Sequence, residues 1–287
     1  MKTTKRCLTC IYDQSKRACE LLHVSVDEAR RIDSVALAMI EQCDMNQTPP
    51  HNAAPLYEAM AEILGVEDLY GTFKKESSQK AKAFIPLCQE HLNTAEDIFC
   101  VATKTAVAGN VIDLAAVMQY DLEEELEKIY HTSFAIDDVK ALESKLSQTQ
   151  TLVYLADNAG EEIFDKLYIE TIKKLYPTIE VYYFVRGRPI INDLTCKDAL
   201  ASKMDEVAHI VDSGVPTPGL ALDMMCEEAR EVFYRAECII AKGMGNYECL
   251  GETKGLPLFF LFKVKCSVVA DAVGADLGSI VCKASCS

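Results

Sequence analysis

The sequence predicts an α/β protein: a three-layer α/β/α sandwich with a mainly parallel sheet, preceded by an all-helical N-terminal domain. From residue 151 onward, short β-rich runs alternate with helical segments, which is typical of a parallel sheet with helices on both faces. Before about residue 150, helix follows helix. A polar stretch, Ser147-Gln-Thr-Gln150, separates the two regions. We therefore expect a helical domain over 1–148 and an α/β/α domain over 149–287.

The N-terminal helices are predicted from their caps, breaks and apolar spacing. Ser25-Val-Asp-Glu28 is a capping-box pattern, followed by apolar residues at helical spacing. Thr48-Pro-Pro-His51 is expected to break the chain, and Ala54-Pro55 to begin the next helix, because proline suits a first turn. Pro86 should bend or split a long helical segment. The remaining helices are expected over 72–92, 95–108 and 122–131.

The second half contains five expected strands, each a short run rich in β-branched and aromatic residues. They cover residues 151–156, 180–185, 207–212, 237–242 and 258–264. Helices are expected between them over 161–175, 197–204 and 222–235. In open parallel sheets, ligands bind outside the carboxyl ends of the strands. The residues that follow each strand are therefore the candidate site.

Composition and charge limit the classes of partner. The chain has 287 residues, of which 49% are hydrophobic and 25% are charged, an ordinary globular balance. Its net charge is -15, with 29 basic against 44 acidic residues. A like-charged surface repels duplex nucleic acid and anionic membranes, so neither is expected as a partner. The negative net charge does not exclude an anionic small molecule as a ligand, since basic residues gathered in one site can make the local electrostatic potential positive.

Cysteine usage and the apolar runs predict a cytoplasmic protein. The basic start is followed by a polar stretch where a signal peptide needs an apolar core. The longest apolar runs, such as 256–262, are far shorter than the ~18 residues of a membrane span. Thirteen cysteines, an odd number, indicate reduced thiols.

Polar groups follow every predicted strand. The stretches are Asp157-Asn158-Ala-Gly-Glu161, Arg186-Gly-Arg-Pro-Ile-Ile-Asn192-Asp193-Leu-Thr195, Asp212-Ser-Gly214, Lys242-Gly243-Met-Gly245-Asn246-Tyr-Glu248 and Lys265-Cys266. Each stretch alone has a plain structural explanation as a turn or helix cap. The glycine pattern also lacks the ending of a nucleotide P-loop. The functional interpretation rests on their joint occurrence at one edge of the sheet.

The residue types indicate phosphate chemistry. Oxygen donors from Asp157, Asn158 and Asp193 suit a divalent cation such as Mg²⁺ or Mn²⁺. Positive charges on Arg186, Lys242 and Lys265 would neutralise a phosphate, and Gly243 and Gly245 permit close backbone approach to an anion. A cation, a phosphate cradle and a carboxylate together describe phosphoryl transfer or phosphate-ester hydrolysis.

In these segments, and in Ala106-Val-Ala-Gly109-Asn110-Val-Ile-Asp113, the sequence resembles the metal-dependent damage-control phosphatases, long catalogued as domain of unknown function 89. The Cys7-Leu-Thr-Cys10 start is similar to the compact, cysteine-bearing prokaryotic branch. The resemblance implies hydrolysis of small phosphorylated metabolites with a divalent metal (Mn, Mg, Co or Ni) at Asp157, Asn158 and Asp193. It implies catalytic roles for Asp157, Asp193 and Lys265. The implied substrate-binding residues are Glu161, Arg186, Asn192, Gly243, Gly245, Asn246, Glu248 and Asn110.

Several alternatives stay open at this point. The nucleophile is either a metal-bound water or the carboxylate of Asp157. One rival function is an S-adenosylmethionine-dependent carboxyl methyltransferase, although Asp157-Asn-Ala-Gly is a poor match for that cofactor's glycine-rich turn. Another rival is a non-catalytic metal- or phosphate-binding protein. The substrate, the metal among these four and the oligomeric state are not specified by the sequence.

The cysteines near the N-terminus form a second candidate site. Cys7, Cys10 and Cys19 suggest a second metal site or a redox pair, with Cys282 or Cys286 as a fourth ligand. The alternative is ordinary thiols on an N-terminal helix. The five histidines form no metal-binding pattern.

Overall fold

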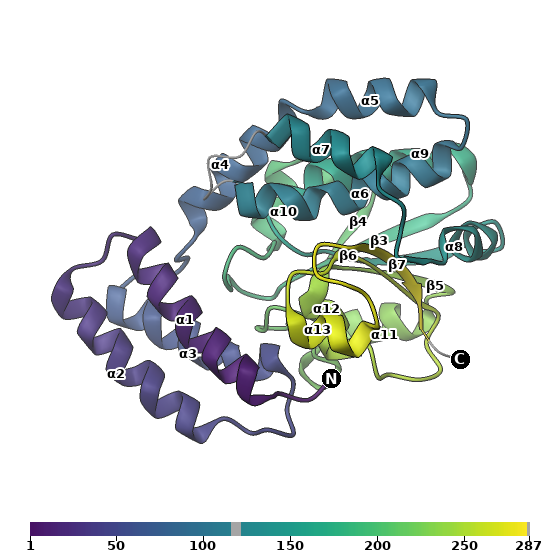
Figure 1. The fold of residues 1–287 in the computed structure, drawn as a ribbon. Coiled ribbons are helices and arrows are strands. Elements are labelled where there is room, and N and C mark those ends of the chain that lie inside the picture. The colour runs from purple at the N-terminus through teal and green to yellow at the C-terminus, as the bar shows by residue number, and fades with distance from the viewer. Residues whose placement is uncertain (116–121, 286–287) are drawn as a thin grey trace.

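The computed structural model describes residues 1–115 and 122–285, with side chains described outside 110–122. It confirms the predicted fold class: one seven-stranded, mostly parallel sheet lies between two helical layers (Figure 1). The sheet order is β1-β7-β6-β5-β2-β3-β4. The five strands from β6 to β4 run parallel, whereas β7 runs antiparallel to β6, and β1 pairs parallel with β7.

Four of the five predicted strands match the structure to within one residue at each end. The exception is the strand predicted over 207–212, which begins two residues later, at His209. The five strands are β2 (Thr151–Leu155), β3 (Glu180–Val185), β4 (His209–Asp212), β5 (Cys238–Lys242) and β6 (Leu258–Lys263). Two strands at one end of the sheet were not expected from the sequence, the edge strand β1 (Ile136–Asp137) and its neighbour β7 (Ile280–Ala284). The first is only two residues long, so no alternation reveals it.

Each face of the sheet packs against its own hydrophobic cluster of buried side chains. One cluster lies between the sheet and the helices α6 and α9, and the other lies against α11, α12 and α13. These helices span α6 (Ile98–Ala115), α9 (Glu161–Leu175), α11 (Glu227–Arg235), α12 (Gly243–Leu250) and α13 (Ser267–Val273). The first cluster also takes in side chains from α4 (Gly71–Lys82), α5 (Ile85–Thr94), α7 (Leu122–His131), α8 (Val139–Leu146) and α10 (Cys196–Ala201).

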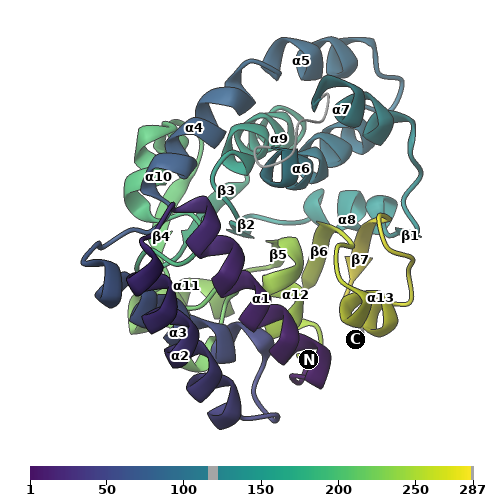
Figure 2. The same cartoon turned by 60° about the vertical axis from the view of Figure 1, so that its left-hand side comes forward.

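Three N-terminal helices pack on one another and form a cap with its own small core (Figure 2). They are α1 (Lys5–Leu21), α2 (Val26–Gln42) and α3 (Pro49–Leu64). The capping box is confirmed, because Ser25 N donates to Glu28 Oε2 at 2.8 Å and Glu28 N donates to Ser25 Oγ at 3.3 Å. We refer to α1–α3 as the cap.

The helix start predicted at Ala54 is wrong. The helix α3 already begins at Pro49, with Pro49 and Pro50 in its first turn, and Pro55 lies inside it. Two prolines can open a helix because the first amides lack intrahelical partners in any case. The expected split at Pro86 is confirmed, since α4 ends at Lys82 and Pro86 lies in the first turn of α5.

Residues on both sides of the polar stretch at 147–150 share the first hydrophobic cluster. Leu142 and Leu146 of α8 pack in it together with Leu152 and Tyr154 of β2. The domain boundary between 148 and 149 stays a prediction. Among the residues described, no helix is both long and apolar enough to cross a membrane.

Candidate active site

A cleft of about 560 Å³ lies between the cap and the carboxyl edge of the sheet. Its cap side comes from α1 and α3, with Tyr70 and α4 beside them. Its sheet side comes from the segments after β2, β3, β4 and β6 and from the first turns of α12, which follows β5 directly. The structure brings most of the predicted residues to this cleft. Those that line it are Asp157, Asn158, Asn192, Asp193, Gly245, Glu248 and Lys265.

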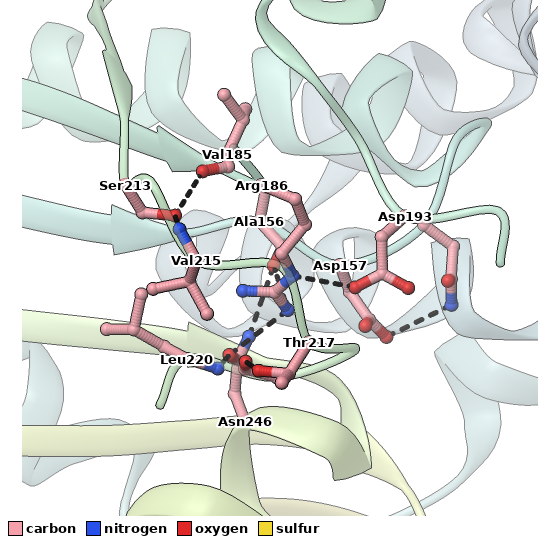
Figure 3. A network of polar contacts seen from close by, with 12 residues as sticks. Ala156, Asp157, Val185, Arg186, Asp193, Ser213, Val215, Thr217, Leu220 and Asn246 are labelled. Atoms are coloured by element: carbon pink, nitrogen blue, oxygen red, sulfur yellow. Dashed lines mark hydrogen bonds and ion pairs between the residues drawn. The ribbon is translucent and has the colours of Figure 1, made fainter. Parts of the chain in front are cut away.

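The loops after β2 and β3 are joined by backbone hydrogen bonds, which bring Asp157, Asn158 and Asp193 together. Figure 3 shows the side chains of Asp157 and Asp193 close to each other. The amide of Leu194 donates to the carbonyl of Asp157 at 3.0 Å, and that of Ala159 donates to the carbonyl of Asn192 at 2.8 Å. Asn158 and Asp193 pair as an isolated antiparallel bridge. Two segments that are distant in the sequence therefore deliver two carboxylates and one amide to the same place.

Gly243 makes room for the Asp157 carboxylate. Its φ of +77° is in the left-handed region, and a Cβ at this position would stand 1.8 Å from Oδ2 of Asp157. Only glycine meets both demands without strain. The sequence predicted that this glycine admits a phosphate, whereas in the structure it admits a carboxylate.

Arg186 holds Asp193 from behind the cleft. Its Nε donates to Asp193 Oδ2 at 2.7 Å, and both side chains are almost fully buried. One guanidinium NH₂ donates to Oδ1 of Asn246 at 3.2 Å. Asn246 in turn donates to the carbonyls of Ala156 and Lys242, at 3.1 and 2.7 Å. Figure 3 shows this buried network beside Asp157.

These contacts correct part of the sequence interpretation. Arg186, Asn246 and Glu161 were expected to bind substrate, but none of them lines the cleft. Their polar groups are engaged in buried hydrogen bonds within the protein. Lys242, expected to neutralise phosphate, is fully buried and bonds to Asp165 at 2.6 Å and to Glu161 at 3.1 Å. From the sequence, an inward-pointing polar residue in a loop cannot be distinguished from an outward-pointing one.

The electrostatics of the site favour a bound cation. Burial, together with the carboxylates of Glu161 and Asp193, raises the pKa of Asp157 well above its usual range, while Arg186 and Lys265 act in the opposite sense. Behind the cleft, Arg186 and Lys242 are the buried cations that pair with Asp193, Glu161 and Asp165. With Asp157 included, four acidic side chains lie near two buried cations, and Lys265 at the cleft adds a third positive charge. A divalent ion would offset the remaining excess of negative charge.

The donor set fits a hard divalent ion. Two carboxylates and one amide offer only oxygen ligands, which Mg²⁺ and Mn²⁺ prefer. Within the described residues, no group of three or more His, Cys, Asp or Glu side chains is placed to hold a metal. The predicted set has two such residues, Asp157 and Asp193, and Asn158 is the third donor. An ion with so few protein ligands keeps positions for water or substrate.

The outer part of the cleft carries groups suited to an anionic substrate. Lys263 is the last residue of β6, and Lys265 follows two residues later. Arg17 reaches the cleft from α1. Arg17 and the aromatic wall of Tyr57, Tyr70 and Phe73 were missed by the sequence analysis. No sequence signal marks them, because apolar and charged residues at helical spacing predict only packing. The side chain of Asn110, a predicted substrate ligand, lies outside the described residues.

Glu248, Cys7 and Cys10 also line the cleft. Burial raises the pKa of Glu248, which lines the cleft, to about 7. Cys7, Cys10 and Cys19 all lie on α1. A helix rises about 1.5 Å per residue, so Cys7 and Cys19 are roughly 18 Å apart along its axis and cannot share one ion. Cys7 and Cys10 line the cleft, whereas Cys19 does not. Cys282 is buried in β7, and Cys286 lies outside the described residues.

The chain is similar over nearly its whole length to proteins of one known family. A family model described as the damage-control phosphatase ARMT1-like domain matches residues 3–281. A protein of Pyrococcus horikoshii named a damage-control phosphatase is 32% identical over 284 residues, 98% of each chain. A protein of Archaeoglobus fulgidus with the same name is 32% identical over 295 aligned residues, 99% of each chain. The crystal structure of a DUF89 family protein from Pyrococcus horikoshii matches with a TM-score of 0.91, at 30% identity and full coverage of both chains.

Proposed function

Because the chain belongs to the damage-control phosphatase ARMT1-like family, we propose that it is a metal-dependent phosphatase that hydrolyses small phosphorylated metabolites. The relatives named phosphatases support hydrolysis of a phosphate ester. The convergence of Asp157, Asn158 and Asp193 in one cleft with Lys265 is the observation that carries the proposal. The strongly acidic chain supports a small molecule over nucleic acid as substrate. The many thiols support a reducing, cytoplasmic location.

In this proposal Asp157, Asn158 and Asp193 hold one divalent ion, Mn²⁺, Mg²⁺, Co²⁺ or Ni²⁺. A bound ion would supply Lewis acidity toward the phosphoryl group. Arg186 fixes the position of Asp193, and Gly243 leaves the space that Asp157 occupies. Lys265 attracts the phosphate, and Asn192, Gly245 and Glu248 lie along the substrate side of the cleft.

The attacking group is water or the carboxylate of Asp157. Mass spectrometry of protein quenched during turnover separates the two, because only attack by Asp157 produces a phosphorylated aspartate. Water attack instead requires a general base near the phosphate. The candidate is Glu248, whose raised pKa of about 7 is suited to proton transfer near neutral pH.

The deciding assay measures hydrolysis of p-nitrophenyl phosphate with each of the four metals, and with a chelator as the control. We expect activity that depends on added metal and is lost in Asp193→Asn. Asp212→Asn serves as the matched control, since Asp212 lies at the end of β4 and does not line the cleft. Metal binding without turnover of any phosphate ester would support the non-catalytic alternative. Direct binding of S-adenosylmethionine would support the methyltransferase.

A further inference from the structure

Behind the cleft lies a buried charged network that the proposed chemistry does not use directly. Lys242, at the end of β5, places its Nζ 2.6 Å from Asp165 Oδ1 and 3.1 Å from Glu161 Oε2. Asp165 also accepts the hydroxyls of Tyr154 at 2.6 Å and Tyr183 at 2.9 Å. All five side chains are buried, with exposures of 0 or 1%. Burying three charges in this way is costly unless each has partners.

The network reaches the cleft through one amide group. Nδ2 of Asn158 donates to Oε1 of Glu161 at 3.2 Å and to Oδ2 of Asp157 at 3.1 Å. Both partners are carboxylate oxygens, which accept hydrogen bonds and repel another oxygen. The Nδ2 atom is therefore fixed on the side of these carboxylates, and Oδ1 lies on the opposite side of the amide group.

We propose that Lys242, Asp165 and Glu161 are positioning residues, which hold Asn158 with its amide oxygen directed toward a divalent cation. The inference rests on the proposed function, because it concerns the metal ligand set of that site. An amide nitrogen does not ligate Mg²⁺ or Mn²⁺, whereas an amide oxygen does. The orientation of this one amide thus decides whether Asn158 is a ligand.

The fold explains how the network is assembled. Glu161 and Asp165 are four residues apart on α9, so they lie on the same helical face, toward the sheet. Lys242 comes from β5 and the two tyrosines come from β2 and β3. Gly109 of α6 packs so closely that a Cβ there would stand 3.1 Å from Cα of Glu161. Glu161 is consequently held between α6 and the sheet and presents one oxygen to Lys242 and the other to Asn158.

The variant Glu161→Gln tests this role with almost no change of shape. Lys242 can only donate, so the oxygen of the introduced amide must face Lys242 and its nitrogen must face Asn158. Asn158 then has one mismatched partner in either orientation. If it keeps its orientation, its Nδ2 faces the introduced NH₂ group; if it turns over, its Oδ1 faces Oδ2 of Asp157 and its Nδ2 faces the cation position. We expect the Kd for Mn²⁺, measured by electron paramagnetic resonance, to rise 10–100-fold, as for other residues that orient metal ligands.

The double variant Glu161→Gln/Asn158→Asp supplies the rescue. The two oxygens of the introduced carboxylate are equivalent, so one accepts from the introduced amide and the other faces the ion. We expect this double variant to recover most of the lost Mn²⁺ affinity. The single variant Asn158→Asp should bind Mn²⁺ less tightly than the wild type, despite its extra carboxylate, because it has no hydrogen to donate to Glu161 or Asp157.

Tyr183→Phe is the structural control for this series. It removes one hydrogen bond to Asp165 but leaves in place the contacts Lys242–Asp165, Lys242–Glu161 and Asn158–Glu161, through which the network reaches Asn158. The Mn²⁺ affinity of this variant should stay within twofold of the wild type.

The outcomes separate the two claims. If the wild type binds no Mn²⁺, the proposed metal site and this inference both fail. If the wild type binds Mn²⁺ and folded Glu161→Gln binds it equally well, only the positioning role fails. An Asn158→Asp variant that binds Mn²⁺ as tightly as the wild type also overturns the positioning role, and this result does not depend on whether Glu161→Gln folds.

Discussion

A Cβ atom on Gly243 would lie 1.8 Å from Oδ2 of Asp157. The Asp157 carboxylate therefore occupies the space that a side chain at position 243 would need. The start of α12 and the loop after β2 are thereby held together by steric fit as well as by hydrogen bonds. The geometry of the proposed metal site thus depends on residues that never contact the ion.

Replacement of Gly243 by alanine should abolish phosphatase activity, because Asp157 must move aside. The matched control is Gly255→Ala, since Gly255 has nearly the same φ, +76°, but nothing within 4 Å of its would-be Cβ. Both variants should lose roughly 1–2 kcal/mol of stability from left-handed backbone strain. Gly243→Ala should lose more than Gly255→Ala, because its Cβ also clashes with the Asp157 carboxylate. Melting curves and initial rates compare the two. Activity retained in Gly243→Ala would show that Asp157 has no role in turnover.

Replacement of Arg186 by methionine should destabilise the protein by about 3–5 kcal/mol, because it leaves Asp193 buried without this partner. Arg188 provides the comparison, since its pair with Glu58 at 2.7 Å is about half exposed. Arg188→Met should cost no more than about 1 kcal/mol. Urea unfolding of both variants at neutral pH measures the difference, and equal costs would contradict the structural role assigned to Arg186.

Glu162 should make stability depend on pH. Its buried carboxyl accepts from Ser78 Oγ and from the amide of Gly160, and burial raises its pKa to about 7. The folded protein therefore binds this proton more tightly than the unfolded chain does, and the free energy of unfolding falls as pH rises from about 4.5 to 7.

In Glu162→Gln this fall should shrink by about 1–3 kcal/mol, the free energy linked to a shift of roughly one to two and a half pKa units. The amide keeps both hydrogen bonds if the Ser78 hydroxyl reverses its direction. Chemical unfolding between pH 5 and pH 8 gives the comparison with the wild type. Identical pH profiles would mean that the Glu162 carboxyl is ionised throughout this range in the folded protein.

Cys19 should be dispensable for any metal that the protein retains. It lies about three turns of α1 beyond Cys7, outside the cleft. Elemental analysis of purified Cys19→Ser should give the same metal content as the wild type. Loss of a bound metal in this variant would require α1 to break between Cys7 and Cys19.

The sequence predicted the architecture well because its signals are local. Strand β3 is read directly from Glu-Val-Tyr-Tyr-Phe-Val, and the start of α2 from Ser25 and Glu28. Strand β7 was missed because Ile280–Ala284 is a short run in which only Ile280 and Val281 are β-branched, so its strand signal is weak. Pro55 misled the assignment of α3, since a proline that starts a helix and one tolerated inside it look the same in a sequence.

The sequence predicted which residues gather at the candidate site, but not which of them line the cleft and which are buried behind it. The order of motifs brought Asp157, Asn158 and Asp193 to one edge, as the paired loops confirm. The sequence could not show that Arg186 and Lys242 point inward, because that depends on the carboxylates they meet in the folded chain. The cap wall, with Arg17 and Tyr57, is a product of tertiary packing alone.

The short strand β1 has a consequence for dividing the chain. Residues 136–137 pair with Val281 and Cys282, so the helical half supplies the outermost strand of the other half's sheet. A fragment starting at residue 149 would leave β7 with one row of backbone amides and carbonyls unprotected, and would uncover the face of α9 that α6 shields. Such a fragment should self-associate through the unpaired edge of β7. A fragment that begins before residue 98 would keep both β1, which pairs with β7, and α6, which covers α9.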